Sequence, residues 1–253
     1  MKKKINKFLF MVLLSVAMVV SAGIFSFSNN YKTAYASANN GGGLYVGNNS
    51  VFNFTHGSIS GMTATNGGGV YVANGGTFNM SGGSIFGNKA TNNGDSIYNN
   101  GTFIMTGGTI GETEGVGWIY CNEGSTTKIY GGTVLDNFYM YSNLQTKVGA
   151  TIGGKIELSD SNKITVEDYA GTTPTYKIKL TNSRPSGTIV TFLGNNTTSP
   201  DISKFTVTGY NPDYDIVIRK NSNGYFELAL TTIELPSTWQ TEIASSTYMT
   251  TTV

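Results

Sequence analysis

The sequence contains little charge, one histidine and one cysteine. Only 12% of its 253 residues are charged, about half the share of about 25% in an average soluble domain. The single Cys121 cannot form an intramolecular disulfide, and with His56 as the only histidine the chain has no cysteine–histidine cluster that would bind zinc. Phosphate-binding loops, serine-hydrolase elbows and zinc-protease motifs are also absent. We therefore expect no cofactor and no metal, and a fold stabilised by packing and backbone hydrogen bonds.

Glycine and aromatic residues are abundant instead. The chain has 33 glycines, and 12% of its residues are aromatic. Glycine costs about 1 kcal/mol per helix position relative to alanine, so a helical protein with this composition is disfavoured. Asparagine and glycine tolerate the positive φ of tight turns, which join short strands. The composition predicts an all-β protein.

The amino terminus has the pattern of a signal peptide. Four lysines precede residue 8, residues 8–20 are apolar except for Ser15, and Ala34-Tyr35-Ala36 is a possible cleavage site. A cut near Ser21-Ala22-Gly23 and an uncleaved anchor are the alternatives. The apolar run is short for a membrane span of about 20 residues. We interpret residues 1–36 as a signal peptide and expect a secreted or cell-surface protein with no membrane span after cleavage.

Cleavage would change the sign of the net charge. The remaining chain has 11 basic and 15 acidic residues. An acidic chain is unsuited to nucleic acid or to an anionic membrane as its main partner. We expect neither, and we expect a monomer whose partner is a glycan or a protein of a cell surface.

A repeat of about 25 residues is the most informative feature of the sequence. The segment 41–46, Gly-Gly-Gly-Leu-Tyr-Val, recurs as Gly-Gly-Gly-Val-Tyr-Val at 67–72. A Gly-Gly-Ser/Thr-apolar element ends each unit, and its successive copies are offset by about 24 to 26 residues. One such unit cannot bury its own apolar side chains, but stacked units can if each forms one turn of a coil. The period is too short for propeller blades, which need about 40 residues.

Aligning the units places like residues in columns. With a side-chain period of two, alternate columns face the same side of a strand. We expect three interior columns: Phe52, Phe78 and Phe103; Phe54, Met80, Met105 and Ile129; and Ile59, Ile85, Ile110 and Val134. Met80 and Ile85 should therefore be nearly buried, Cys121 should lie in the core with Val46 and Val72, and each glycine pair should form a corner.

These units resemble the repeats of bacterial surface and adhesin-like proteins with a right-handed parallel β-helix, within the broad pectin-lyase-like architecture. The resemblance covers about residues 41–135. It implies a right-handed parallel β-helix and export. It implies little about activity, because one architecture carries lyases, hydrolases and inert stalks.

After the repeats, apolar alternation continues without glycine pairs. An open coil end exposes unpaired strand edges and requires a cap. We assign residues 37–154 to the repeats, 155–232 to the terminal coils and an irregular β cap, and 233–253 to a Ser/Thr-rich tail. The cap should include a hairpin around Asn221-Ser222-Asn223-Gly224. A separate small β-sandwich is the alternative for 155–232, and Leu-Pro-Ser-Thr-Trp at 235–239 is a chance match to a sortase signal, since Trp239 replaces its glycine.

The candidate binding residues are four tyrosines that hold the same place in consecutive units: Tyr45, Tyr71, Tyr98 and Tyr120. If Val70 and Val72 point inward, Tyr71 points outward, and the four rings form a stripe that stacks on itself or binds a glycan or protein. Glu112, Glu114 and Glu123 are interpreted as solvated corner residues, with a cation or catalytic site as the alternative. His56 is interpreted as a turn substitution.

We therefore expect a secreted or cell-surface structural or adhesive protein that presents repeated side chains, and no catalytic residues. The alternative is a polysaccharide-active enzyme of pectin-lyase-like type. Three acidic side chains clustered with a lysine or arginine in one groove would favour the enzyme. An outward tyrosine stripe without that cluster would favour binding.

Overall fold

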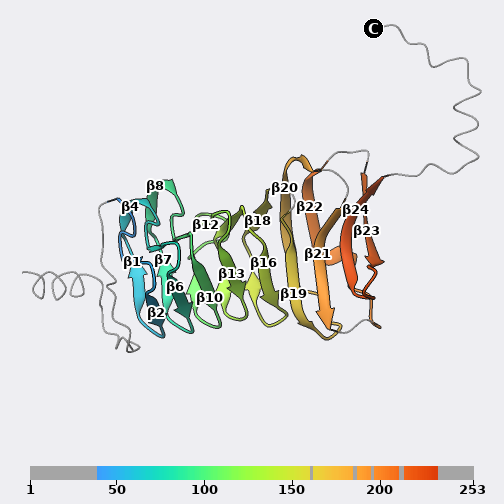
Figure 1. Cartoon of the computed structure of the whole chain (residues 1–253), viewed down its shortest axis with the longest axis horizontal. Coiled ribbons are helices and arrows are strands. Elements are labelled where there is room, and N and C mark those ends of the chain that lie inside the picture. The colour runs from blue at the N-terminus through green and yellow to red at the C-terminus, as the bar shows by residue number, and fades with distance from the viewer. Residues whose placement is uncertain (1–38, 160–161, 185–186, 195–196, 211–213, 233–253) are drawn as a thin grey trace, which may run out of the picture.

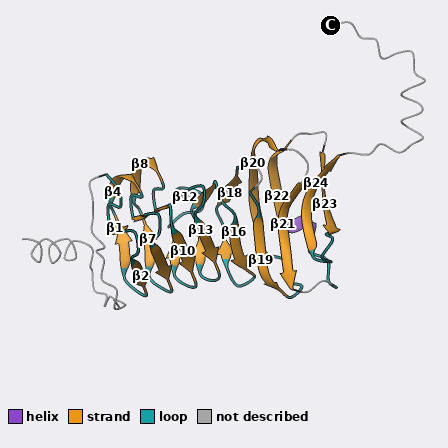
Figure 2. Cartoon of the chain, in the orientation of Figure 1, coloured by secondary structure: helices purple, strands orange, loops and turns teal. Residues whose placement is uncertain are grey.

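The chain forms an elongated β-solenoid in the computed structural model, which describes residues 39–159, 162–184, 187–194, 197–210 and 214–232 (Figure 1). The predicted signal peptide, the tail and the sortase-like segment lie outside these residues. The strands stack along the long axis of the molecule, and the described part contains one short 3₁₀ turn, Ile202–Lys204, and no α-helix (Figure 2). The all-β parallel β-helix expected from the repeat is confirmed.

Two long sheets run the length of the solenoid. The first has the strand order β1 (Leu44–Val46), β5 (Val70–Val72), β9 (Ile97–Asn99), β12 (Trp118–Cys121), β15 (Asn137–Met140), β18 (Lys155–Leu158), β20 (Tyr176–Arg184) and β22 (Phe205–Tyr210). The second has the order β2 (Val51–Phe54), β6 (Thr77–Met80), β10 (Thr102–Met105), β13 (Thr126–Ile129), β16 (Leu144–Lys147), β19 (Ile164–Tyr169), β21 (Gly187–Gly194), β24 (Phe226–Thr232) and β23 (Tyr214–Lys220). Both sheets continue across residue 155.

A third sheet closes only the first five coils. Its order is β17 (Thr151–Ile152), β14 (Thr133–Val134), β11 (Thr109–Ile110), β7 (Ser84–Phe86) and β3 (Ser58–Ser60), and β4 (Thr63–Asn66) pairs with β8 (Lys89–Asn93) beside it. After Ile152 the chain alternates between the two long sheets alone. The strands there are longer, with nine residues in β20 and eight in β21.

The predicted columns are confirmed by the strand register. Phe52 pairs with Phe78, and Phe78 pairs with Phe103. The Phe54–Met80–Met105–Ile129 and Ile59–Ile85–Ile110–Val134 columns are in register as well. Met80 is 1% exposed and Ile85 is 0% exposed, as expected for interior positions. Phe52 is only partly buried because it belongs to the first coil.

Glycine corners allow the coils to stack closely. Gly67 has φ of 62°, and a Cβ atom there would lie 2.3 Å from the carbonyl oxygen of Val70. At Gly82 a Cβ atom would lie 2.2 Å from the Thr55 carbonyl oxygen of the preceding coil. His56 occupies the equivalent place in the first coil, which has no preceding coil among the described residues. A side chain is therefore tolerated at this corner in the first coil, where it meets no carbonyl oxygen of a preceding described coil, whereas the later coils have glycine there. As predicted, His56 is an exposed turn residue.

Asparagine side chains reinforce the stack on its outside. Asn79 donates to Asn53 at 2.9 Å, and Asn66 donates to Asn40 at 3.1 Å. Asn122 donates to Asn100 at 2.9 Å in later coils. In such a ladder the side-chain amide of one coil donates to the side-chain oxygen of the asparagine in the neighbouring coil. The ladder therefore favours the register that places these asparagines opposite one another.

The carboxyl-terminal end of the second sheet is antiparallel. Strand β24 pairs with β21, and β23 pairs with β24. The predicted hairpin is confirmed, because the Asn221 amide donates to Tyr225 and the Gly224 amide donates back to Asn221, each at 2.9 Å. Leu228 and Leu230 of β24 are 0% and 1% exposed. The hairpin therefore covers the edge that β21 would otherwise present.

Candidate binding face

The outer face of the first sheet carries a stacked row of tyrosines. Its members are Tyr45, Tyr71, Tyr98 and Tyr120, which we call the tyrosine row. The strand register pairs each with the next, since the coils repeat one inter-strand distance apart. The flanking Val70 and Val72 are fully buried, whereas all four tyrosines are partly exposed. The expected outward direction of the tyrosines follows from this alternation.

The rings lie face to face. Centroid separations are 5.3 Å for Tyr45–Tyr71, 5.0 Å for Tyr71–Tyr98 and 5.0 Å for Tyr98–Tyr120, and the interplanar angles are 1°, 4° and 11°. Such contacts stabilise a protein by about 0.5–1.5 kcal/mol per pair beyond area burial. Because neighbouring ring faces cover one another, the ring edges and hydroxyl groups are what the row offers to a ligand.

The row is a neutral surface. Partial burial raises the pKa of Tyr71, Tyr98 and Tyr120 above the usual value for a phenol, and the neighbouring phenols contribute at Tyr71 and Tyr120. A phenol with a raised pKa stays protonated throughout the physiological range. Each of these three hydroxyl groups can therefore both donate and accept a hydrogen bond.

The row continues through two tyrosines that the repeat did not predict, Tyr139 and Tyr141. Tyr139 pairs with Tyr120, and the Trp118 ring stacks on Tyr139 with centroids 4.1 Å apart. Tyr141, 43% exposed, lies 5.4 Å from Tyr120. The signal was available, because Phe138-Tyr139-Met140 has the apolar–tyrosine–apolar pattern of the earlier strands without the preceding glycines.

Beyond Tyr139 the same face becomes charged. Glu157 pairs with Tyr139 in register and is 4% exposed, and its carboxylate binds Lys155 at 2.7 Å and Lys179 at 3.3 Å. Glu114 forms an ion pair with Lys177. The two carboxylates are thus each held by lysines at the end of the aromatic surface.

The three acidic candidates of the third and fourth units are not brought together. Glu112 and Glu114 lie in the corner between β11 and β12, whereas Glu123 lies in the corner between β12 and β13. The alternative of one cation site formed by all three is wrong for that reason. Within the described ranges, no group of three histidine, cysteine, aspartate or glutamate residues is placed to bind a metal ion.

Cys121 lies in the core column that the alignment of the repeat units with one another predicted for it. It is 0% exposed, and burial raises the pKa of its thiol to about 12. The column also contains Asn99, which the sequence analysis missed and which pairs with Val72 and Cys121. Asn99 donates to the Thr127 hydroxyl at 2.9 Å, and that hydroxyl donates to the Cys121 sulfur at 3.2 Å. These hydrogen bonds satisfy the buried Asn99 amide, which explains how a polar side chain is accommodated in the core.

Asp136 is a buried carboxylate that no sequence motif marks. It is 3% exposed in the corner between β14 and β15, where it accepts a hydrogen bond from the Ser96 hydroxyl. Gly111 and Gly117 leave room for it, since a Cβ atom on either would lie 2.5 Å from a carboxylate oxygen. Burial raises the pKa of Asp136 above its usual value, although the bonds from Ser96 and the Gly117 backbone oppose the shift.

This raised pKa predicts a pH dependence of stability. A carboxyl group with a raised pKa in the folded state binds protons more readily when folded than when unfolded, so the free energy of unfolding decreases as pH rises above the unfolded value near 3.8. We expect Asp136→Asn to remove this decrease and to be at least as stable as the parent at neutral pH. Urea unfolding of both chains across a series of pH values measures it. Parallel stability–pH curves for the two chains would contradict the assignment.

Comparisons with known proteins identify no relative. Searches against protein-family models, curated proteins and solved structures each gave no match. The part of the chain that the structure describes contains no helix with the length and hydropathy of a membrane span.

Proposed function

We propose that the protein is a secreted or cell-surface structural and adhesive β-solenoid, which binds an extended glycan or protein along the tyrosine row. The observation that carries the proposal is the uninterrupted stack of partly exposed rings at 5.0–5.3 Å spacing. A ligand with a similar repeat could contact successive hydroxyl groups in the same way. Each contact is weak, but a row of contacts on one rigid scaffold gives avidity.

Export supports the same function. The amino-terminal lysines, the apolar run of residues 8–20 and the Ala34-Tyr35-Ala36 site are those of a signal peptide. A solenoid with few charges and a repeated outer surface suits a structural role outside the cell. The proposal also draws on the resemblance of the repeats to those of bacterial surface proteins.

Two double variants of the tyrosine row test the proposal. Tyr71→Phe with Tyr98→Phe keeps the stack and removes two hydroxyl groups, so stability should change little while attachment weakens about tenfold. Tyr71→Ser with Tyr98→Ser removes the rings and should weaken attachment further. Attachment to immobilised cell-wall glycans and to host-cell surfaces is measured by surface plasmon resonance and adhesion assays.

A control separates binding from folding in this experiment. Thermal unfolding should be nearly unchanged for the phenylalanine double variant and lowered for the serine double variant, which loses ring stacking. Equal attachment of the parent and both double variants would reject the tyrosine row as the binding surface.

A polysaccharide-active enzyme is the second candidate. It draws on the two carboxylates, Glu114 and Glu157, that lie with three lysines at the end of the aromatic face. Carboxylates beside a sugar chain can supply acid–base chemistry. Release of unsaturated or reducing sugar ends from pectin-like polymers, abolished in Glu157→Gln, would establish this function instead.

A further inference from the structure

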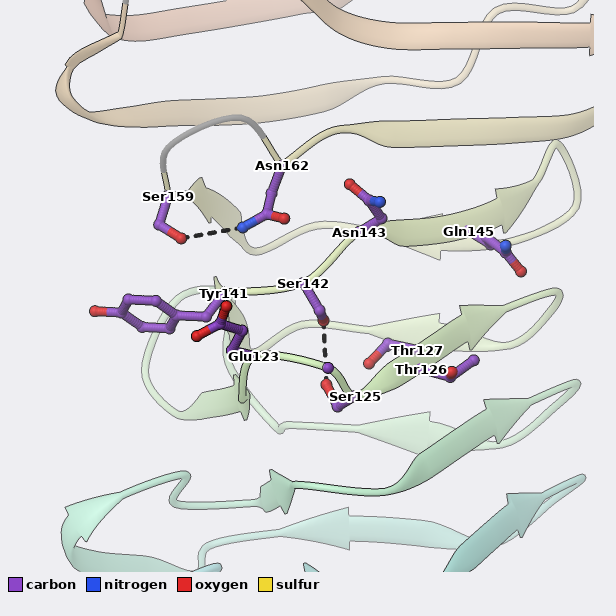
Figure 3. Close-up of a pocket in the computed structure, with 11 residues that line it drawn as sticks. Glu123, Ser125, Thr126, Thr127, Tyr141, Ser142, Asn143, Gln145, Ser159 and Asn162 are labelled. Atoms are coloured by element: carbon purple, nitrogen blue, oxygen red, sulfur yellow. Dashed lines mark hydrogen bonds between the residues drawn. The ribbon is translucent and has the colours of Figure 1, made fainter. Parts of the chain in front are cut away.

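An open groove lies at the corner between the two long sheets, beside the tyrosine row. It has a volume of about 460 Å³ and is lined by residues that follow β12, β15 and β18 and by residues of β13 and β16. Its described lining residues are Glu123, Gly124, Ser125, Thr126, Thr127, Tyr141, Ser142, Asn143, Gln145, Ser159 and Asn162. In the view of Figure 3, Glu123 and Tyr141 lie toward one end of the groove and Gln145 toward the other.

The lining is rich in hydroxyl and amide groups. Ser125 and Ser142 form the floor, where their hydroxyl groups lie 3.1 Å apart (Figure 3). The Lys163 backbone amide donates to the side-chain oxygen of Asn143 at 2.9 Å, so this oxygen is already used and the NH₂ group is the part of the Asn143 side chain that can donate to a ligand. The groove can therefore both donate and accept hydrogen bonds along its length.

The charge of the lining restricts the ligand. Among the described lining residues, Glu123 is the one charged side chain, and no lysine or arginine is present. A phosphate, sulfate or uronate group is normally bound by arginine or lysine, so an anionic ligand does not fit. The lining residues that the structure describes also include no aliphatic side chain, which argues against a lipid or another apolar ligand. A neutral ligand with many hydroxyl groups fits these restrictions.

Tyr141 is the one aromatic side chain among the lining residues that are described. Its side chain is 43% exposed, and its ring is tilted by 38° from Tyr120 at a centroid distance of 5.4 Å. Tyr141 thus departs from the parallel stack, and the exposed part of its ring can pack against the C–H face of a sugar. Through Tyr120, this ring also connects the groove to the tyrosine row.

We propose that this groove is a subsite for one or two neutral hexose units of a glycan chain. Tyr141 packs against a sugar ring, and Glu123, Asn143 and Gln145 bind its hydroxyl groups. The volume lies within the range of about 300–1,000 Å³ for small-molecule sites. The inference rests on the proposed function and makes it more specific, because it names a neutral glycan where the tyrosine row alone admits a glycan or a protein.

Calorimetric titration with hexaoses tests the subsite. The probes are neutral β-linked glucose and mannose hexaoses and a galacturonic acid hexaose. We expect at least one neutral hexaose to bind and the uronic acid hexaose not to bind. Tyr141→Ala should weaken the neutral complex by about tenfold, and Glu123→Gln should weaken it by a smaller factor.

Glu112→Gln is the matched control, because Glu112 is an exposed glutamate in a different corner. It should bind like the parent, and thermal unfolding should show that all three variants are folded. No binding of either neutral hexaose, equal binding of the uronic acid hexaose, or unchanged affinity in Tyr141→Ala would each overturn the subsite. These outcomes leave the proposed function open to its own test, since attachment through the tyrosine row is measured with variants of Tyr71 and Tyr98.

Discussion

Replacing Phe78 with alanine is expected to lower the free energy of unfolding by about 3–5 kcal/mol. The side chain is 0% exposed, and its ring lies between those of Phe52 and Phe103 at centroid distances of 6.2 and 5.6 Å. Its removal leaves a cavity that closely stacked coils cannot close, because backbone hydrogen bonds fix the distance between them. Urea unfolding of the parent and the variant measures the difference.

Phe52→Ala is the matched control in the same column. Phe52 belongs to the first described coil and is only partly buried, so its truncation should cost clearly less than that of Phe78. Equal losses at the two positions would show that burial within the column does not determine stability, and no loss at Phe78 would contradict the interior assignment.

Removal of the carboxyl-terminal hairpin is the second change with a large expected effect. A chain that stops before Tyr214 would expose the edge of β21 and the apolar residues that Leu228 and Leu230 cover. An uncovered edge of eight residues is a template for pairing with another chain. We expect this shortened chain to form large assemblies, detected by size-exclusion chromatography with light scattering.

The control for this experiment is a chain that stops after Thr232. It keeps both strands of the hairpin, and light scattering should show that it has the same oligomeric state as the full chain. If the shorter chain, without the hairpin, also keeps that mass and the parent's unfolding temperature, the hairpin is not the cap that the edge requires.

The candidate site was only partly visible in the sequence. The repeat placed Tyr45, Tyr71, Tyr98 and Tyr120 in one column because their spacing is that of the coil. The glycines that mark each unit are missing before Tyr139 and Tyr141, so the repeat alone did not assign them, and only the apolar–tyrosine–apolar pattern of residues 138–140 indicated the continuation. The corner groove could not be predicted, because its described residues come from three successive coils, and each contributes an ordinary polar segment.

The sequence by itself determined the all-β class, the coil repeat and the interior columns. These follow from local rules: glycine marks corners, and alternation within each strand separates interior from exterior residues. Only the tertiary structure decided which side chains of neighbouring coils contact one another. It showed that the tyrosine faces cover one another, that Asp136 is buried among glycines, and that Glu123 lies apart from Glu112 and Glu114. The physical reason is that these relations depend on distances between coils and corners, whereas the sequence pattern specifies only the order of residues within each coil.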